Sequence, residues 1–234
     1  VLIFWTLKNT MNFQLYFRKL FRIILMLFFR FDYWHTSPLD NRKYAIDIIS
    51  MLNRRVSRES LIEIGCGLGD ILTKAHYDRK YFYDISPEVL SAAAFLQKFS
   101  KISSINSFKT FNLLTDTVEK DLKFDAIVLV NWIHGFESEA LKYRLNNIVN
   151  NNLNEKGLIV FDIIENNPSY KFNHTASDLI DLQKFDITTF DEYPFGRKLF
   201  FSVETPQIQL IPPTLGQNSC YVFLEDNEFP SIKF

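Results

Sequence analysis

Three glycines at alternate positions stand between an apolar run and a segment of helical pattern. Residues 61–64 predict a buried strand, Gly65, Gly67 and Gly69 follow it, and the helical pattern begins at Asp70. Glycine lets the backbone turn sharply and approach a ligand without a β-carbon in the way. A helix start also offers N–H groups to a negatively charged group. This strand–turn–helix pattern, which includes Cys66, predicts a ligand-binding turn.

Two acidic residues stand at the ends of neighbouring predicted strands. Glu63 lies just before the glycine turn, and Asp84 follows the strand expected at residues 81–83, with Ile85 beside it. In a doubly wound sheet these strand ends meet at the switch point, where ligands bind. Ser86 is better placed to cap the following helix, with Pro87 at its first position. Asp84 is therefore expected to accept hydrogen bonds from the two ribose hydroxyls of a nucleoside.

These motifs resemble those of class I, Rossmann-like S-adenosylmethionine-dependent methyltransferases. The glycine turn with Glu63 is similar to their motif I, residues 81–84 to motif II, and residues 124–134 to motif IV. The resemblance covers roughly residues 57–204 and implies S-adenosylmethionine as the cofactor. It also implies that Asn112 receives the adenine amino group, with Asp116 as the alternative. Asn131 begins the segment expected to face the transferred methyl group.

The acceptor of the methyl group is less defined by the residues. His134 is the candidate general base, since an imidazole titrates near neutrality, and the competing interpretation is a structural histidine. His35, beside Trp34, is the second candidate, from an N-terminal lid. The segment after residue 130 lacks the polar–Pro–Pro–aromatic signature of amino-group methylation. This favours a hydroxyl on a small molecule or on a glycan or lipid precursor.

Two other functions remain open at this point. The first is an NAD(P)-dependent oxidoreductase, which Asp70 disfavours because a dinucleotide fingerprint has its third glycine at that position. The second is a non-catalytic, membrane-associated protein of methyltransferase fold.

Two cysteines, Cys66 and Cys220, form neither a disulfide framework nor a metal site, and no metal ligand set is predicted. They are consistent with a reducing compartment, and we expect a cytoplasmic protein.

Short apolar runs alternate with helical segments after residue 57, which predicts an α/β fold. We expect a doubly wound, seven-stranded sheet, mostly parallel, with an antiparallel edge strand from a hairpin between residues 185–190 and 198–204. The chain divides into N-terminal helices at residues 1–56, the methyltransferase domain at 57–204 and an irregular tail at 205–234. A short strand is expected at residues 221–224 of that tail.

Residues 13–31 predict a basic amphipathic helix. Four cations (Arg18, Lys19, Arg22 and Arg30) fall on one face, apolar residues lie opposite, and no acid precedes Asp32. Residues 1–60 hold ten Lys and Arg against four Asp and Glu, whereas the rest of the chain is mildly acidic. This excludes a global affinity for nucleic acid and favours peripheral binding to an anionic membrane surface. The alternative is a helix packed on its own domain.

Arg22 and Arg30 interrupt the apolar run, so neither a membrane span nor a signal peptide is expected.

Overall fold

The computed structural model describes residues 2–164, 168, 170–180, 185–189, 193 and 197–204. The tail from residue 205 onward lies outside the described residues, and so do Cys220 and the strand expected at residues 221–224. The hairpin turn expected between the last two strands lies there too, apart from Tyr193.

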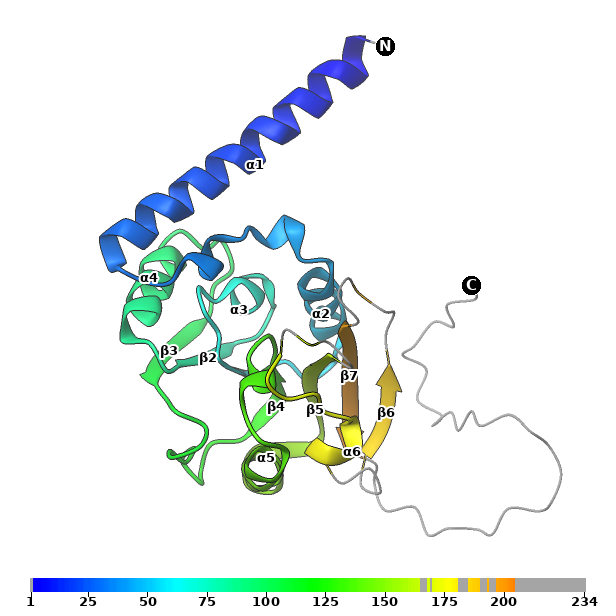
Figure 1. Ribbon diagram of the computed structural model, residues 1–234. Helices are drawn as coiled ribbons and strands as arrows, with labels where there is room; N and C mark the ends of the chain where they lie inside the picture. Colours follow the sequence, from blue (N-terminus) through cyan, green and yellow to red (C-terminus); the bar gives the residue numbers. More distant parts are fainter. Residues whose placement is uncertain are drawn as a thin grey trace, which may run out of the picture.

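Seven strands of the described chain form one sheet in the order β3-β2-β1-β4-β5-β7-β6 (Figure 1). The first five strands pair in parallel, whereas β7 is antiparallel to both β5 and β6. This confirms the predicted mostly parallel sheet and its terminal hairpin. The antiparallel strand β7 lies second from the edge, because the hairpin places β6 outside it. The strands are β1 (Ser60–Ile64), β2 (Arg79–Asp84), β3 (Ile105–Thr110), β4 (Phe124–Leu129), β5 (Leu153–Ile164), β6 (Phe185–Thr189) and β7 (Arg197–Glu204).

Helices cover both faces of the sheet, which explains why the central strands are buried along their whole length and consist mostly of apolar residues. All residues of β1 and β4 are buried, and successive side chains of a strand point to opposite faces. In β4, Ile127 packs in a cluster with Leu145 of α5, and Val128 packs in a second cluster with Ile48 of α2. The helices are α1 (Leu2–Phe29), α2 (Lys43–Arg54), α3 (Asp70–Lys74), α4 (Pro87–Gln97), α5 (Ser138–Asn152) and α6 (Ala176–Leu179), with 3-10 turns η1 (Tyr33–Thr36), η2 (Leu39–Asn41) and η3 (Ile133–Gly135).

The start of α4 follows the local prediction. The hydroxyl of Ser86 accepts a hydrogen bond from the backbone N–H of Val89 at 3.2 Å, and Pro87 occupies the first helical turn. A proline is tolerated there because its missing N–H would have no helical partner. The cap therefore leaves the carboxylate of Asp84 available for other contacts.

Helix α1 is longer than the segment predicted at residues 13–31, because it begins at Leu2. Figure 1 shows it extending away from the body, with its C-terminal end beside α4. That end is fixed by Leu25 and Phe31, which pack with Val89 and Ala92 of α4. No helix among the described residues is long and apolar enough to cross a membrane.

Candidate functional site

The glycine turn connects β1 to α3 along a path that requires glycine. Gly65, Gly67 and Gly69 have φ angles of 74°, 56° and 71°, a region that other residues occupy only with strain. The backbone N–H groups of Gly65 and Cys66 donate to the carbonyl oxygen of Tyr83 at 2.7 and 3.0 Å. The turn is thus attached to the end of β2.

Aromatic rings of the chain itself occupy the space beside these glycines. A β-carbon on Gly65 would lie 2.2 Å from Nε1 of Trp132, and one on Gly69 would lie 2.4 Å from Cε1 of Phe82. At Gly67 the nearest atom is Nδ1 of His35, at 2.9 Å. The sequence suggested close approach of a ligand as the reason for these glycines. The structure adds a second reason, since each glycine accommodates a ring from another segment.

Asp84 lies at the carboxyl end of β2, as predicted, and it organises the turn. Its Oδ2 accepts a hydrogen bond from the N–H of Gly67 at 2.8 Å, and its Oδ1 accepts one from the N–H of Ser86 at 3.0 Å. A carboxylate offers about four acceptor positions. Two of them therefore remain for a ligand.

Glu63 is a buried acid with an incomplete set of hydrogen bonds. Its side chain is 3% exposed, and its Oε2 has no hydrogen-bond partner among the described residues. Burial raises the pKa of Glu63 well above its usual range, although the nearby charge of Arg42 opposes the shift. An unpartnered buried carboxyl is costly unless a donor or a cation completes it.

A cavity of about 530 Å³ lies at the carboxyl ends of β1, β2 and β4, the expected place for a ligand in such a sheet. Of the nine predicted cofactor residues, Gly69 alone is outside its wall. The other eight line it: Glu63, Gly65, Cys66, Gly67, Asp84, Ile85, Asn112 and Asn131.

The N-terminal segment forms another wall of this cavity. From the sequence, only His35 of this segment was expected to reach the site. Asp32, Trp34, His35, Arg42 and Tyr44 all line it. Burial lowers the pKa of His35 below the ordinary histidine value, against the opposing charges of Asp84 and Asp32. His35 is therefore a neutral imidazole at the cavity wall near pH 7.

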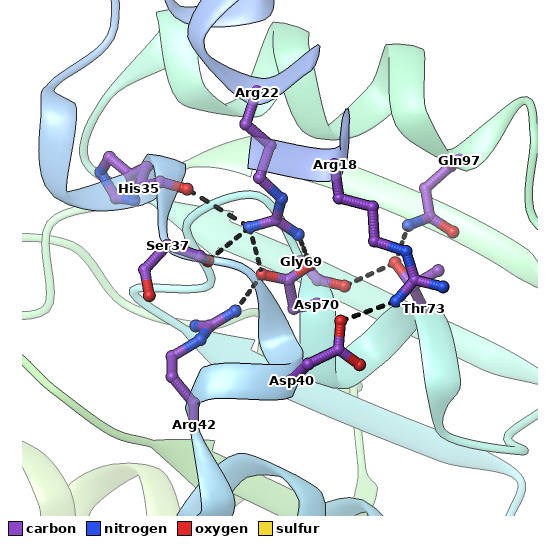
Figure 2. A network of polar contacts seen from close by, with 10 residues as sticks. All are labelled: Arg18, Arg22, His35, Ser37, Asp40, Arg42, Gly69, Asp70, Thr73 and Gln97. Carbon is purple, nitrogen blue, oxygen red and sulfur yellow. Dashed lines mark hydrogen bonds and ion pairs between the residues drawn. The ribbon is translucent and has the colours of Figure 1, made fainter. Parts of the chain in front are cut away.

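An ion-pair cluster fixes this segment against the glycine turn (Figure 2). Asp70, the residue after Gly69, binds the guanidinium groups of Arg22 from α1 and Arg42 before α2. Arg22 also donates to the carbonyl oxygen of Ser37 at 2.7 Å. Burial alone would raise the pKa of Asp70, but the charges of Arg42 and Arg22 overcome it and hold this pKa below its usual range. Because α3 has only five residues and begins with this carboxylate, its N-terminus is a poor site for an anion.

Asn112 and Asn131 occupy the wall in different ways. The Oδ1 of Asn112 accepts a hydrogen bond from the N–H of Leu114 at 3.0 Å and keeps a second acceptor position. Asp116, the predicted alternative, is exposed and accepts the N–H of Asn112 at 2.8 Å. Asp116 therefore supports the turn, whereas Asn112 faces the cavity.

Asn131 is the centre of a hydrogen-bond network at the end of β4. Its amide nitrogen Nδ2 donates to the hydroxyl of Tyr44 at 2.7 Å, and its Oδ1 accepts from Arg197 at 2.6 Å. Its backbone N–H donates to Asp162 at 2.8 Å. With both side-chain ends engaged, Asn131 holds the wall in shape.

His134 lies behind the cavity and does not line it. The residue is 1% exposed, and its Nε2 lies 3.5 Å from Oδ2 of Asp162. The ring packs edge-on against Tyr170, with the centroids 4.9 Å apart. Its predicted role as general base remains a prediction, whereas His35, the second candidate, lies on the cavity wall.

Several wall residues were not predicted from the sequence, among them Arg42, Tyr44 and Arg197. Trp132, three positions beyond the last residue of β4, belongs to the segment expected to face the methyl group, and it lines the cavity. No pattern in the sequence indicates that Arg42 or Tyr44 approaches β1. Among the described residues, no group of three or more His, Cys, Asp or Glu could hold a metal ion.

The strand order and the cavity can be compared with known proteins. No protein-family model and no curated protein sequence matches this chain. The N-methyltransferase NodS from Bradyrhizobium japonicum WM9, solved with S-adenosyl-L-homocysteine, matches with a TM-score of 0.58 and 16% identity over 70% of this chain and 87% of that one. The magnesium protoporphyrin IX methyltransferase ChlM from Synechocystis PCC 6803 matches with a TM-score of 0.57 and 12% identity, over 71% and 84%.

A third similar structure is an S-adenosylmethionine-dependent methyltransferase from Clostridium acetobutylicum ATCC 824. Its TM-score is 0.53 and its identity 14%, over 70% of this chain and 92% of that one. The chain has the fold of the class I S-adenosylmethionine-dependent methyltransferases. In that fold the insertion of β7 between β5 and β6 separates the sheet from the dinucleotide-binding type, whose order is 3-2-1-4-5-6.

Proposed function

We propose that this protein is an S-adenosylmethionine-dependent methyltransferase. The observation that carries the proposal is the placement of two carboxyl groups with remaining acceptor capacity, Glu63 and Asp84, in one cavity at the switch point of the sheet. S-adenosylmethionine carries an ammonium group at one end and a ribose with two hydroxyls in its middle. An unpartnered buried carboxyl suits the ammonium, and Asp84 suits the hydroxyls.

The remaining walls suit the rest of this cofactor. Asn112 keeps an acceptor position for the adenine amino group, and Ile85, Phe111 and Leu113 provide apolar surface for the ring. When bound, the cofactor would supply a methyl group on a positively charged sulfur. The residues of this chain would bind it, hold the acceptor beside it and exclude water.

For the acceptor we propose a hydroxyl on a small molecule or on a glycan or lipid precursor. Positioning contributes most to such a transfer, and a general base adds a smaller factor. His35 is suited to accept the hydroxyl proton, because it lies on the cavity wall and its lowered pKa keeps it neutral. As the base, His134 would act from behind the wall through the carboxylate of Asp162, whose Oδ2 lies 3.5 Å from its Nε2. We propose the cytoplasm as the place of action.

Calorimetry of the purified protein tests the cofactor directly. S-adenosylmethionine and its homocysteine product are expected to bind, while NAD and NADP are not, and native mass spectrometry shows whether either ligand co-purifies. Binding of a nicotinamide dinucleotide without S-adenosylmethionine would support the oxidoreductase instead. Absence of all of these ligands would leave the non-catalytic interpretation.

A further inference from the structure

Helix α1 presents an apolar face to solvent. Seven of its large apolar side chains between residues 16 and 28 are 38% to 78% exposed, and at 100° per residue these seven fall within an arc of about 140°. Single exposed apolar residues are ordinary, but a continuous patch on one face marks a contact with a partner or a membrane. We call this patch the outward face; it consists of Tyr16, Phe17, Leu20, Phe21, Ile24, Leu27 and Phe28.

Contacts on the opposite side fix the rotation of the helix. Arg18 forms an ion pair with Asp40 at 2.6 Å, and Arg22 forms one with Asp70 (Figure 2). Leu25, 5% exposed, packs against α4. The outward face cannot turn toward the body without breaking these contacts.

This arrangement differs from the one that the sequence predicts for membrane binding. From the sequence, the four basic residues were expected to meet the lipid. In the structure Arg18 and Arg22 turn toward the protein itself, while Lys19 and Arg30 are exposed and have no ion pair with a described residue. Lipid contact would therefore be made mainly by apolar side chains, with two cations at the border.

Charge distinguishes between the partners that could cover the outward face. Residues 1–31 contain no Asp or Glu, so a second copy of α1 would offer no acid to Lys19 and Arg30, whereas Arg18 and Arg22 already pair with Asp40 and Asp70. An anionic lipid surface instead supplies negative charge beside Lys19 and Arg30. Tyr33 and Trp34, 61% and 70% exposed just beyond the helix, are the residue types favoured at the membrane–water boundary.

We propose that the outward face of α1 docks on an anionic lipid surface. The helix would lie in the interface with its apolar side chains inserted, the usual arrangement of an amphipathic helix. Trp34 is both exposed and part of the cavity wall, so docking would bring the mouth of the cavity to the lipid. This last step rests on the proposed function and points to an acceptor that is itself anchored in the membrane.

The test is co-sedimentation of the full chain with vesicles of phosphatidylcholine, with or without phosphatidylserine. The double variant Leu27→Gln/Phe28→Gln removes the two most exposed side chains of the outward face, 70% and 78% exposed. We expect it to bind the anionic vesicles at least about tenfold less tightly. Tyr143→Gln, which changes a 68% exposed side chain on α5, is the matched control and should bind like the parent protein.

The charge contribution has its own variant. Lys19→Gln/Arg30→Gln should weaken binding to anionic vesicles and leave the residual binding to neutral vesicles unchanged. A parent protein that ignores both kinds of vesicle would overturn the proposal. So would a dimer, seen in analytical ultracentrifugation, that the Leu27→Gln/Phe28→Gln variant converts to monomer while vesicles have no effect. Calorimetry of the same variants with S-adenosylmethionine keeps the two proposals apart, because docking does not require the cofactor.

Discussion

The indole of Trp132 lies against Gly65 and donates a hydrogen bond from Nε1 to the carbonyl oxygen of Ile64 at 2.7 Å. A residue from the exit of β4 thus closes the turn that leaves β1. The contact depends on the missing side chain of Gly65, since a β-carbon there would overlap the ring. The first glycine of the turn therefore has a packing role in addition to its positive φ.

Gly65→Ala should destabilise the protein by more than about 1 kcal/mol, because it adds left-handed backbone strain to a collision with Trp132. Gly135→Ala is the matched control, since nothing lies within 4 Å of the added carbon. Thermal melts of the two variants provide the comparison. Equal melting temperatures for both would contradict the packing role of Gly65.

Asp84→Ala should weaken the binding of S-adenosylmethionine by at least about tenfold. A hydrogen bond to a charged group contributes about 1.5–3 kcal/mol, and about 1.4 kcal/mol corresponds to one decade of affinity. Calorimetry measures the effect, with Asp121→Ala, an exposed acid, as the control. Unchanged affinity in a folded Asp84→Ala protein would remove Asp84 from the cofactor site.

Glu63 predicts a pH dependence of cofactor binding. Burial raises its pKa in the free protein, so the carboxyl stays protonated above the ordinary value of about 4.3. An ammonium bound beside it favours the ionised form, and binding therefore releases a proton. Affinity should rise with pH between the pKa of Glu63 in the complex and its raised pKa in the free protein, and become constant above the raised pKa.

Calorimetry in two buffers with different heats of ionisation detects this proton. The binding heats should differ between buffers for the parent protein and agree for Glu63→Gln, which keeps the shape of the side chain and cannot ionise. Identical heats for the parent protein within that pH window would show that Glu63 does not meet the ammonium.

The two histidines should differ in their effect on methyl transfer, measured with an acceptor found by screening. His35→Asn should lower kcat by about 100-fold or more, the usual contribution of a general base. With His35 intact, the rate should fall with acid only below about 6.5, since the base is lost when its lowered pKa is passed. His134→Asn should keep this acid limb and lower the melting temperature instead. The reverse pattern would restore His134 as the base.

The local features of the site were predictable from the sequence. The glycine turn, Asp84 and the Ser86 cap each depend on residues within a few positions of one another, and strand and helix periods are set by the order of apolar residues. The terminal hairpin followed from the shortness of its connection, because parallel strands need a longer crossover. The strand ends then met where a doubly wound sheet brings them together.

Contacts between distant segments were decided only by the tertiary structure. Arg22 and Asp70 lie 48 positions apart, and the sequence does not show that Arg22 turns toward the body and leaves apolar residues outside. The same reason explains why His35, and not His134, reached the cavity wall. Each histidine has a tryptophan within two positions in the sequence. The ion pairs of Asp70 draw the N-terminal segment over the glycine turn, whereas Asp162 and Tyr170 enclose His134. Such choices depend on which side chains fill the space between elements, and no local pattern encodes that.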